Sequence, residues 1–388
     1  MLCSWRYLNR VLRPAYGSCI MASSFRVDGT RMWGKPHWHR FFPCANDFCC
    51  TFSYDVREDC ATNQGMDRAE TRTVKEVILS DPVDYVRPMY IIKNTTHRDG
   101  AIHKSNFGLL KLHHITERDE TRLEPMELSE PTDDCHRDWE RFIVHFSSHM
   151  MQIFSLKLAQ TPIDRNPVEL YGYIAVRDRR DSLLNYIVNC SRDDPITVQQ
   201  GSLIEMTGPK RGISMRSSVL LEFDMRIRNG EKEEDDLQLI DGASEVSELT
   251  TTPCRPYTER INGESGAVDI TLAFLHKAVE ATIEVVISEV HSCFSLSLSS
   301  FVCIRGLQKE IQLFHGTIGE SCALRRFVIA VRIDTWMHLK FRIGQKGSRT
   351  DLERYCSFEA NYYGCADQQV MFDVACVSAK VTWSTVPF

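Results

Sequence analysis

A group of histidines and cysteines near the start of the chain has the side chains that bind zinc. The group consists of His37, His39, Cys44, Cys49, Cys50 and Cys60. Imidazole and thiolate are the usual ligands of tetrahedral zinc, but structural zinc sites favour closely spaced pairs such as Cys-x2-Cys. No such pair is present in this group. We therefore interpret it as a cysteine-rich segment without a metal, and we predict neither a metal nor a cofactor for the chain.

Two basic residues stand between glycines in the segment 206–215. Lys210 and Arg211 could hold an anion together with backbone amides. A phosphate loop, however, has the spacing G-x4-G-K-S/T and opens a helix, whereas this segment leads into a strand pattern. Gly–Pro pairs usually mark turns. We therefore predict a tight Gly–Pro hairpin turn here, and keep Lys210 and Arg211 as candidate residues for binding a partner.

A run of acidic residues follows an Asn–Gly pair at positions 229 and 230, which is a strong signal for a β-hairpin. The acidic residues are Glu231, Glu233, Glu234, Asp235 and Asp236. Carboxylates in such a cluster could bind a basic partner or a hard cation. More often an acidic run is a solvated hairpin tip that discourages edge-to-edge pairing. We predict such a tip, and it is the most distinctive candidate for contact with a protein partner.

The residue types needed for nucleophilic catalysis are all present, but no spacing brings them together. Nucleophilic hydrolysis needs a Ser or Cys, a His and an acid in contact, and the chain contains no G-x-S-x-G elbow. We therefore favour a protein that is not an enzyme. The alternative of a hydrolase whose site is assembled from distant loops remains open.

The C-terminal part of the chain alternates between apolar and polar residues. In 219–227 the apolar side chains fall at every second position, from Val219 through Phe223 to Ile227, with Glu222 and Asp224 between them. Successive side chains of a strand point to opposite faces, so this pattern predicts a half-buried strand. The same period returns in 268–274, 281–287 and 327–333. We predict a mainly β fold, an antiparallel β-sandwich or a flattened barrel.

Three regions differ in composition. Residues 1–54 are predicted to be an irregular or targeting leader, and residues 55–141 a polar extension and linker with one short helix over 67–79. Residues 142–388 carry strand signals with turns between them, including 276–290, and are predicted to form the sandwich domain. The N-terminal extension is therefore expected to be poorly ordered and partly helical.

Composition limits the possible partners and compartments. The net charge is −6 and the pI about 6.1, without the basic excess of an obligatory nucleic-acid binder. The chain contains no run of about 18 apolar residues, so we predict no membrane span.

The 15 cysteines are an odd number scattered over a large chain, which favours reduced thiols inside the cell. We expect the cytosol or nucleus, with import into an organelle through the Arg-rich residues 1–27 as an alternative. The oligomeric state is left open.

An ordered series of motifs in the C-terminal part resembles an uncharacterised domain family of grasses. The motifs are MQIFSLKLA (151–159), LYGYIAVRD (170–178), NYIVNCSRDDP (185–195), LIEMTGPKRGISM (203–215), VLLEFDMRIRNGEKEEDDLQLIDGA (219–243), RFVIAVRID (326–334) and KVTWST (380–385). The resemblance covers about residues 150 to 385. It implies a plant protein, with a hint of stress or defence biology, because related grass proteins join such a module to a ribosome-inactivating rRNA N-glycosidase domain. It supplies no mechanism.

The glycosidase activity itself is not transferred to this chain. The active site of those enzymes is similar to a helix with the motif E-A-x-x-R, but here Glu280 and Ala281 are followed by Thr282, Ile283 and Glu284. Without the arginine, depurination would lose its main electrostatic stabilisation. We therefore predict a non-enzymatic β-rich interaction module, with a hydrolase or an activity related to rRNA N-glycosidases as the alternative.

Overall fold

The computed structural model describes residues 86–97, 113, 146–162, 166–180, 183–344 and 351–385. All of them belong to the unit Val77–Phe388. The possible zinc ligands, the leader 1–54, the helix predicted over 67–79 and the import segment lie outside the described residues. The described part is mostly strand, which confirms the prediction of a mainly β, antiparallel fold. Its strands form three sheets, none of which closes into a barrel.

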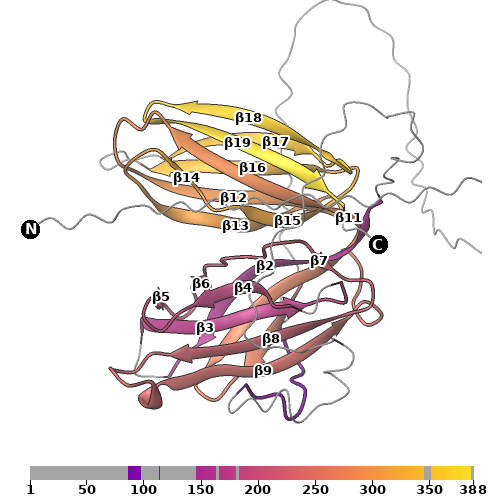
Figure 1. The fold of residues 1–388 in the computed structure, drawn as a ribbon, viewed down its shortest axis with the longest axis vertical. Helices are drawn as coiled ribbons and strands as arrows, with labels where there is room; N and C mark the ends of the chain where they lie inside the picture. Colours follow the sequence, from indigo (N-terminus) through magenta and orange to yellow (C-terminus); the bar gives the residue numbers. More distant parts are fainter. Residues whose placement is uncertain are drawn as a thin grey trace, which may run out of the picture. The chain divides into compact units, whose positions relative to one another are not determined.

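The first sandwich packs a five-stranded sheet against one end of the ten-stranded sheet (Figure 1). The five-stranded sheet has the order β4-β3-β8-β9, with β5 beside β3. Its strands are β3 (Val168–Arg177), β4 (Asn185–Cys190), β5 (Ile196–Val198), β8 (Ser218–Ile227) and β9 (Leu237–Ser247). The facing strands are β1 (Val86–Pro88), β2 (Ser148–Gln160), β6 (Leu203–Ile204), β7 (Ile213–Ser214), β10 (Tyr257–Asn262) and the first half of β11 (Ala267–Ser288). Apolar side chains from both sheets fill the space between them.

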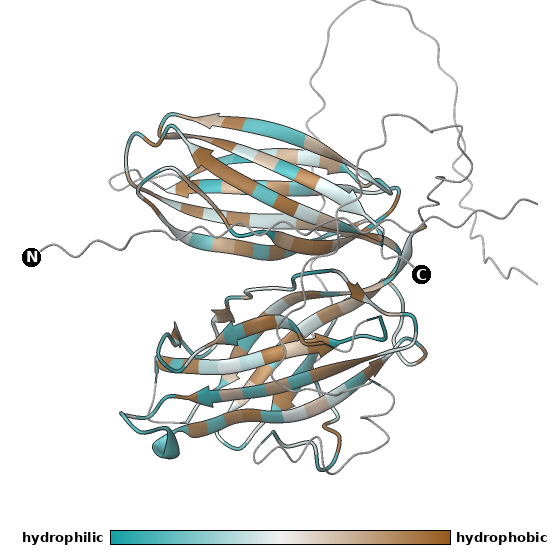
Figure 2. Ribbon diagram, in the orientation of Figure 1, coloured by the Kyte–Doolittle hydropathy of each residue, from teal (hydrophilic) through white to brown (hydrophobic). Residues whose placement is uncertain are grey.

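The second sandwich has a core of its own. A four-stranded sheet, in the order β13-β12-β16-β17, faces the other end of the ten-stranded sheet. The four-stranded sheet consists of β12 (Phe294–Ile304), β13 (Leu307–Ile318), β16 (Trp336–Gly344) and β17 (Leu352–Glu359). The part of the ten-stranded sheet that faces it consists of β14 (Cys322–Ala323), β15 (Phe327–Arg332), β18 (Gly364–Phe372), β19 (Ala375–Ser384) and the second half of β11. Brown and teal residues alternate along many of these strands, as expected for sheets that bury one face (Figure 2).

Strand β11 contributes to both cores, and a change of phase in its sequence explains how. Val268 and Phe274, at even positions, lie in the first core, whereas Ile283 and Ile287, at odd positions, lie in the second. Between the two halves the pairing with β2 shifts register, and Lys277 has φ of 52°. An irregularity of this kind re-aims the side chains that follow it. The strand predicted over 276–290 is thus confirmed as part of a longer one.

The hairpin predicted at Asn229–Gly230 is confirmed, because β8 and β9 pair in antiparallel register on either side of it. Gly230 has φ of +88°, a conformation that glycine adopts without strain. A 3-10 turn, η3 (Glu233–Asp235), completes the connection. The facing of β8 is also as predicted, since Phe223 is completely buried in the first core. The acidic run therefore lies at the end of the β8–β9 hairpin, at the edge of the five-stranded sheet.

The Gly–Pro hairpin predicted within 206–215 is wrong. The short strands β6 and β7 lie on either side of Gly208 and Pro209, and both pair with β2 instead of with each other. The connection lies against β4, where the amides of Thr207 and Gly208 both donate to the carbonyl oxygen of Ile187. A Cβ atom at Gly208 would approach the carbonyl oxygen of Tyr186 to 1.8 Å, so only glycine fits this position. Backbone pairing with β2 and β4 has replaced local hairpin pairing.

Candidate interaction site

The two basic candidates at the Gly–Pro segment have different environments. Arg211 is only 4% exposed, and its Nη1 and Nη2 donate to the two carboxylate oxygens of Asp178 over 2.6 and 2.7 Å. Asp178 also accepts from the amide of Ser214 over 2.8 Å. Lys210 is exposed, and its backbone amide donates to Asn185 over 2.9 Å. Arg211 is thus committed to an internal ion pair, and the two cations do not form a shared anion site.

Glu280, the residue compared with the glycosidase motif, lies in the middle of strand β11. Its carboxyl group is completely buried and accepts from the backbone amide of Gly212 and from the hydroxyl of Ser384. Burial raises its pKa above the usual range, although the two hydrogen bonds and the nearby Arg211 oppose that effect. Since this carboxyl group has no exposure to solvent and sits on a strand, it bonds the segment around Gly212 to β11 and offers no site for a substrate.

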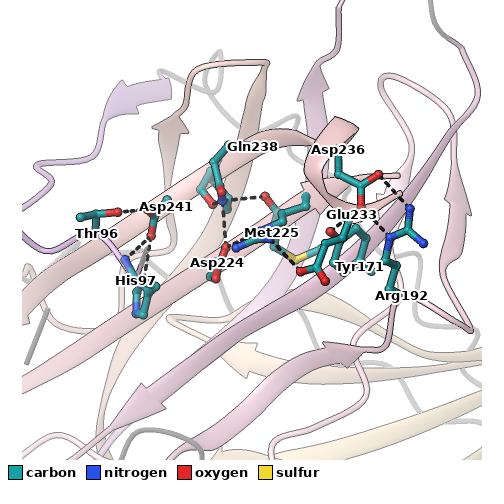
Figure 3. A network of polar contacts seen from close by, with 12 residues as sticks. Thr96, His97, Tyr171, Arg192, Asp224, Met225, Glu233, Asp236, Gln238 and Asp241 are labelled. Carbon is teal, nitrogen blue, oxygen red and sulfur yellow. Dashed lines mark hydrogen bonds and ion pairs between the residues drawn. The ribbon is translucent and has the colours of Figure 1, made fainter. Parts of the chain in front are cut away.

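The acidic candidates lie together at the β8–β9 connection, which we name the acidic tip (residues 229–236). One of them, Asp236, is the structural base of the tip (Figure 3). Its carboxylate accepts from the phenol of Tyr171 over 2.7 Å, from Nε of Arg192 over 2.7 Å and from the amide of Asn229 over 2.7 Å. Three chain segments distant in sequence therefore meet at a single carboxylate.

The network at Asp236 changes the acidity of its members. Burial by itself would raise the pKa of Asp236, but the hydrogen bonds from Arg192, Asn229 and Tyr171 lower it to about 2. The pKa of Tyr171 rises to about 12 because its phenol is partly buried and donates to Asp236. Both shifts keep the carboxylate ionised and the phenol protonated over the whole physiological range. The base of the tip is consequently a fixed hydrogen-bonded unit.

The other acidic residues of the tip, Glu231, Glu233, Glu234 and Asp235, are exposed. Glu233 accepts from Arg226 over 3.1 Å, and Glu234 lies 3.3 Å from the ammonium group of Lys232. Exposed ion pairs of this kind contribute little to stability. The segment 228–236 contains five acidic and two basic residues, so its net charge is −3. Its carboxylates are arranged on a hairpin whose base is held, and they can attract a cationic surface.

Polar residues continue from the tip along the outer face of β8 and β9 (Figure 3). The amide nitrogen of Gln238 donates to Asp224 over 2.8 Å. Further along, Asp241 accepts from the hydroxyl of Thr96 and from the backbone amide of His97, the latter over 2.8 Å. The segment that contains Thr96 and His97 therefore binds β9 through a side-chain carboxylate as well as through its backbone.

Beneath this segment lies a buried charge that the alternating pattern places on the polar face. Glu222 is completely buried, and it accepts from Nε of Arg177 over 2.6 Å. Nε2 of His97 lies 3.5 Å from its second carboxylate oxygen. Burial would raise the pKa of Glu222, but His97 and Arg177 lower it below the usual value. The sequence signalled only a polar residue at position 222. Its burial follows from the covering segment 86–97.

Comparison with known proteins identifies a family. The model of a domain of unknown function (DUF6598) matches residues 150–383, which is more than half of the chain. The chain belongs to the DUF6598 family. The match includes the strands of both sandwiches from β2 to β19 and the acidic tip of the DUF6598 chain, but not β1. A search of curated proteins finds no match.

Several solved structures share a weak similarity with the DUF6598 chain. A human GIVD cytosolic phospholipase A2 is 9% identical, with a TM-score of 0.22 over 63% of this chain and 31% of that protein. A calcium-bound pair of tandem domains from extended-synaptotagmin 2 is 8% identical with a TM-score of 0.22, over 63% of this chain and 98% of that one. This chain thus spans about a third of the phospholipase, and similarities this weak support no inference about function.

Among the described residues, no helix has the length and apolar character that crossing a membrane requires. Within the same residues, no group of three or more histidine, cysteine, aspartate or glutamate side chains is arranged to hold a metal ion. The eight cysteines in the described part of the chain are all free thiols.

Proposed function

We propose that this DUF6598 chain is a non-enzymatic interaction module that binds a basic protein partner through the acidic tip. The observation that carries the proposal is the network at Asp236, which anchors the tip to Tyr171 and Arg192 while the other carboxylates stay exposed. A surface whose backbone is already held loses less conformational entropy on binding than a mobile loop. Charges held at fixed positions also favour fast encounter with a partner of opposite charge.

The cations at the tip fit this proposal. Arg226 and Lys232 each contact one carboxylate of the tip, Glu233 and Glu234 respectively, and Arg226 also contacts Asp224. Glu231 and Asp235 are then the acidic side chains of the tip with no ion pair among the described residues. A lysine- or arginine-rich partner would replace the weak pairs at Glu233 and Glu234 and add new ones. The expected partner is therefore a protein with a basic patch. The proposal includes no nucleic acid and no membrane.

A role in plant stress or defence is part of the same proposal. Its support is the resemblance of the motifs in 151–385 to grass proteins, some of which carry a toxin-like rRNA N-glycosidase domain. A module that binds and restrains a basic enzyme would suit the acidic tip. The cytosol or nucleus remains the expected location, since the chain is rich in cysteine and the thiols described are unpaired.

The test compares what two variants of the full chain capture from plant tissue. The tip variant carries Glu231→Gln, Glu234→Gln and Asp235→Asn, so it removes exposed charge and keeps Asp236 intact. The control variant removes the same charge elsewhere, through Glu310→Gln, Glu320→Gln and Asp373→Asn, all at exposed positions. We expect a basic protein that the wild type and the control capture and the tip variant loses. Capture of the same proteins by all three chains would contradict the proposal.

A further inference from the structure

A groove in the second sandwich lies between β17 and β18, the edge strands of its two sheets. Its volume is about 480 Å³ and it is open to solvent. Ligand sites for small molecules have volumes of roughly 300–1,000 Å³. The groove lies in a sandwich whose core is separate from that behind the acidic tip, and nothing in the proposed function uses it. We name it the aromatic groove, because Trp336, Tyr363 and Trp383 line it.

The aromatic side chains of the groove differ in exposure in a way that suits a ligand. Trp336, the first residue of β16, is 46% exposed, whereas Trp383 on β19 is only 2% exposed and is part of the core. A half-exposed tryptophan leaves a large apolar ring in contact with water, which is unfavourable unless something covers it. A flat apolar surface with a polar rim is the form that the C–H face of a sugar ring requires.

Polar side chains stand beside the exposed ring. Glu359 is the cross-strand neighbour of Trp336, and both Glu359 and Asn361 are exposed. The side-chain oxygen of Asn361 accepts from the amide of Tyr362 over 2.8 Å, which fixes the orientation of this amide group. Its nitrogen and the carboxylate of Glu359 have no bonded partner among the described residues. They offer one donor group and one acceptor group, the pair that a sugar hydroxyl can use.

Another strand cannot add to β17 at the centre of the groove. The side chain of Gln368, on β18, accepts from the amide of Ser357 over 3.1 Å and donates to its carbonyl oxygen over 2.7 Å. These are the backbone groups through which an extended peptide would pair with the edge. Because a side chain already satisfies them, the groove recognises ligands through its own side chains, and a peptide added as a strand is disfavoured.

The charge of the groove selects among the remaining ligands. Among the described residues that line it there is no lysine or arginine, and Glu359 carries a negative charge, so phosphates and nucleic acids are disfavoured. A quaternary ammonium group binds in a close aromatic cage, whereas a groove of about 480 Å³ is far larger than such a group. We propose that the aromatic groove binds a neutral oligosaccharide, whose ring stacks on Trp336 and whose hydroxyls bond to Glu359 and Asn361.

The test is a calorimetric titration of the full chain with four neutral hexasaccharides: cellohexaose, xylohexaose, mannohexaose and chitohexaose. We expect at least one to bind, and Trp336→Ala to weaken that affinity about tenfold or more, as the loss of a stacking ring does elsewhere. Glu359→Gln, which keeps the shape and removes the charge, should weaken it about fivefold. The control is Tyr90→Ala, which removes a ring that is 71% exposed and lies outside the groove.

Three results would overturn the proposal. One is no heat of binding for any of the four sugars at millimolar concentration. Another is equal affinity in the wild type and in Glu359→Gln and Trp336→Ala. The third is binding of choline or of a trimethyllysine peptide in place of the sugars. If Trp336→Ala has a lower melting temperature than the wild type, the affinity of Glu359→Gln alone tests the proposal. None of these results depends on the acidic tip, so failure here is distinct from failure of the proposed protein interaction.

Discussion

The phenol of Tyr171 donates a hydrogen bond to the carboxylate of Asp236 over 2.7 Å and so joins the outer face of β3 to the end of the β8–β9 hairpin. Arg192 binds the same carboxylate from the segment after β4. The like charges at the end of this hairpin repel one another, and these hydrogen bonds hold one of the carboxylates in place. Asp236 therefore holds the charged β8–β9 connection in a fixed position.

Removal of the charge of Asp236 should loosen the tip and change how stability depends on pH. The pKa of Asp236 is about 2 in the folded chain and near 3.8 in the unfolded chain. A lowered folded pKa stabilises the fold above pH 3.8, and this contribution is lost as the pH falls from about 4 to about 2. Urea unfolding of Asp236→Asn should show a loss of about 1–2 kcal/mol at pH 7. The difference from wild type should shrink at pH 2.5, and an equal difference at both pH values would contradict this assignment.

Phe223 tests the packing of the first sandwich. Its ring is completely buried between the two sheets, so Phe223→Ala should lower the free energy of unfolding by about 3–5 kcal/mol. Leu249→Ala provides the control, because Leu249 is 91% exposed and its truncation should change stability by less than about 0.5 kcal/mol. Thermal melts of the two variants measure the contrast. Equal melting temperatures would mean that Phe223 is not in a packed core.

The buried pair of Asp178 and Arg211 should be costly to break from one side only. Asp178→Asn removes the charge of the carboxylate that binds the buried guanidinium of Arg211, and breaking such a pair typically costs about 3–5 kcal/mol. The double variant Asp178→Asn with Arg211→Met removes both charges and should recover part of that loss. Chemical unfolding of the two single variants and the double variant gives the coupling energy. Additive losses would show that the two side chains do not interact.

A pair of stacked histidines should make the fold sensitive to mild acid. The ring centroids of His149 and His276 lie 4.4 Å apart, and the angle between the two ring planes is 10°. Burial and the neighbouring His149 lower the pKa of His276 below 6.5. A folded histidine with a lowered pKa stabilises the fold above pH 6.5, and this stability is lost as the pH falls through the folded pKa. Urea midpoints at pH 7.5 and 5.5 should differ less for His276→Gln than for wild type. The same pH effect in both chains would exclude this cause.

Periodicity predicted the strands because it is a local property of the sequence. Alternation fixed the facing of Phe223 and of the two halves of β11, and Asn229–Gly230 fixed the hairpin. The sequence did not show that the even-to-odd change within β11 sends the strand from one core to another. That outcome depends on which strands pair with each half, and such long-range pairing leaves no mark within a short window.

The candidate site was predicted in part. The exposed acids of the tip were found from a charge run, but Asp236 was placed with them although its role is internal. Arg211 was a candidate because it follows Lys210 between two glycines, and its ion pair with Asp178 was not recognised because Asp178 lies 33 positions earlier in the chain. The groove around Trp336 was missed for the same reason, since its residues come from four strands and from the connection between β17 and β18. Whether a charged side chain is paired or exposed is decided by contacts distant in sequence.

The most direct test of the interaction module is a titration with the basic protein that depends most on the tip for capture. Its dissociation constant is measured at 50 and 300 mM salt against wild type, the tip variant and the control variant. We predict that the tip variant binds at least tenfold more weakly at 50 mM salt and loses most of the salt dependence, while the control matches wild type. Equal affinity of all three chains at both salt concentrations would contradict the account.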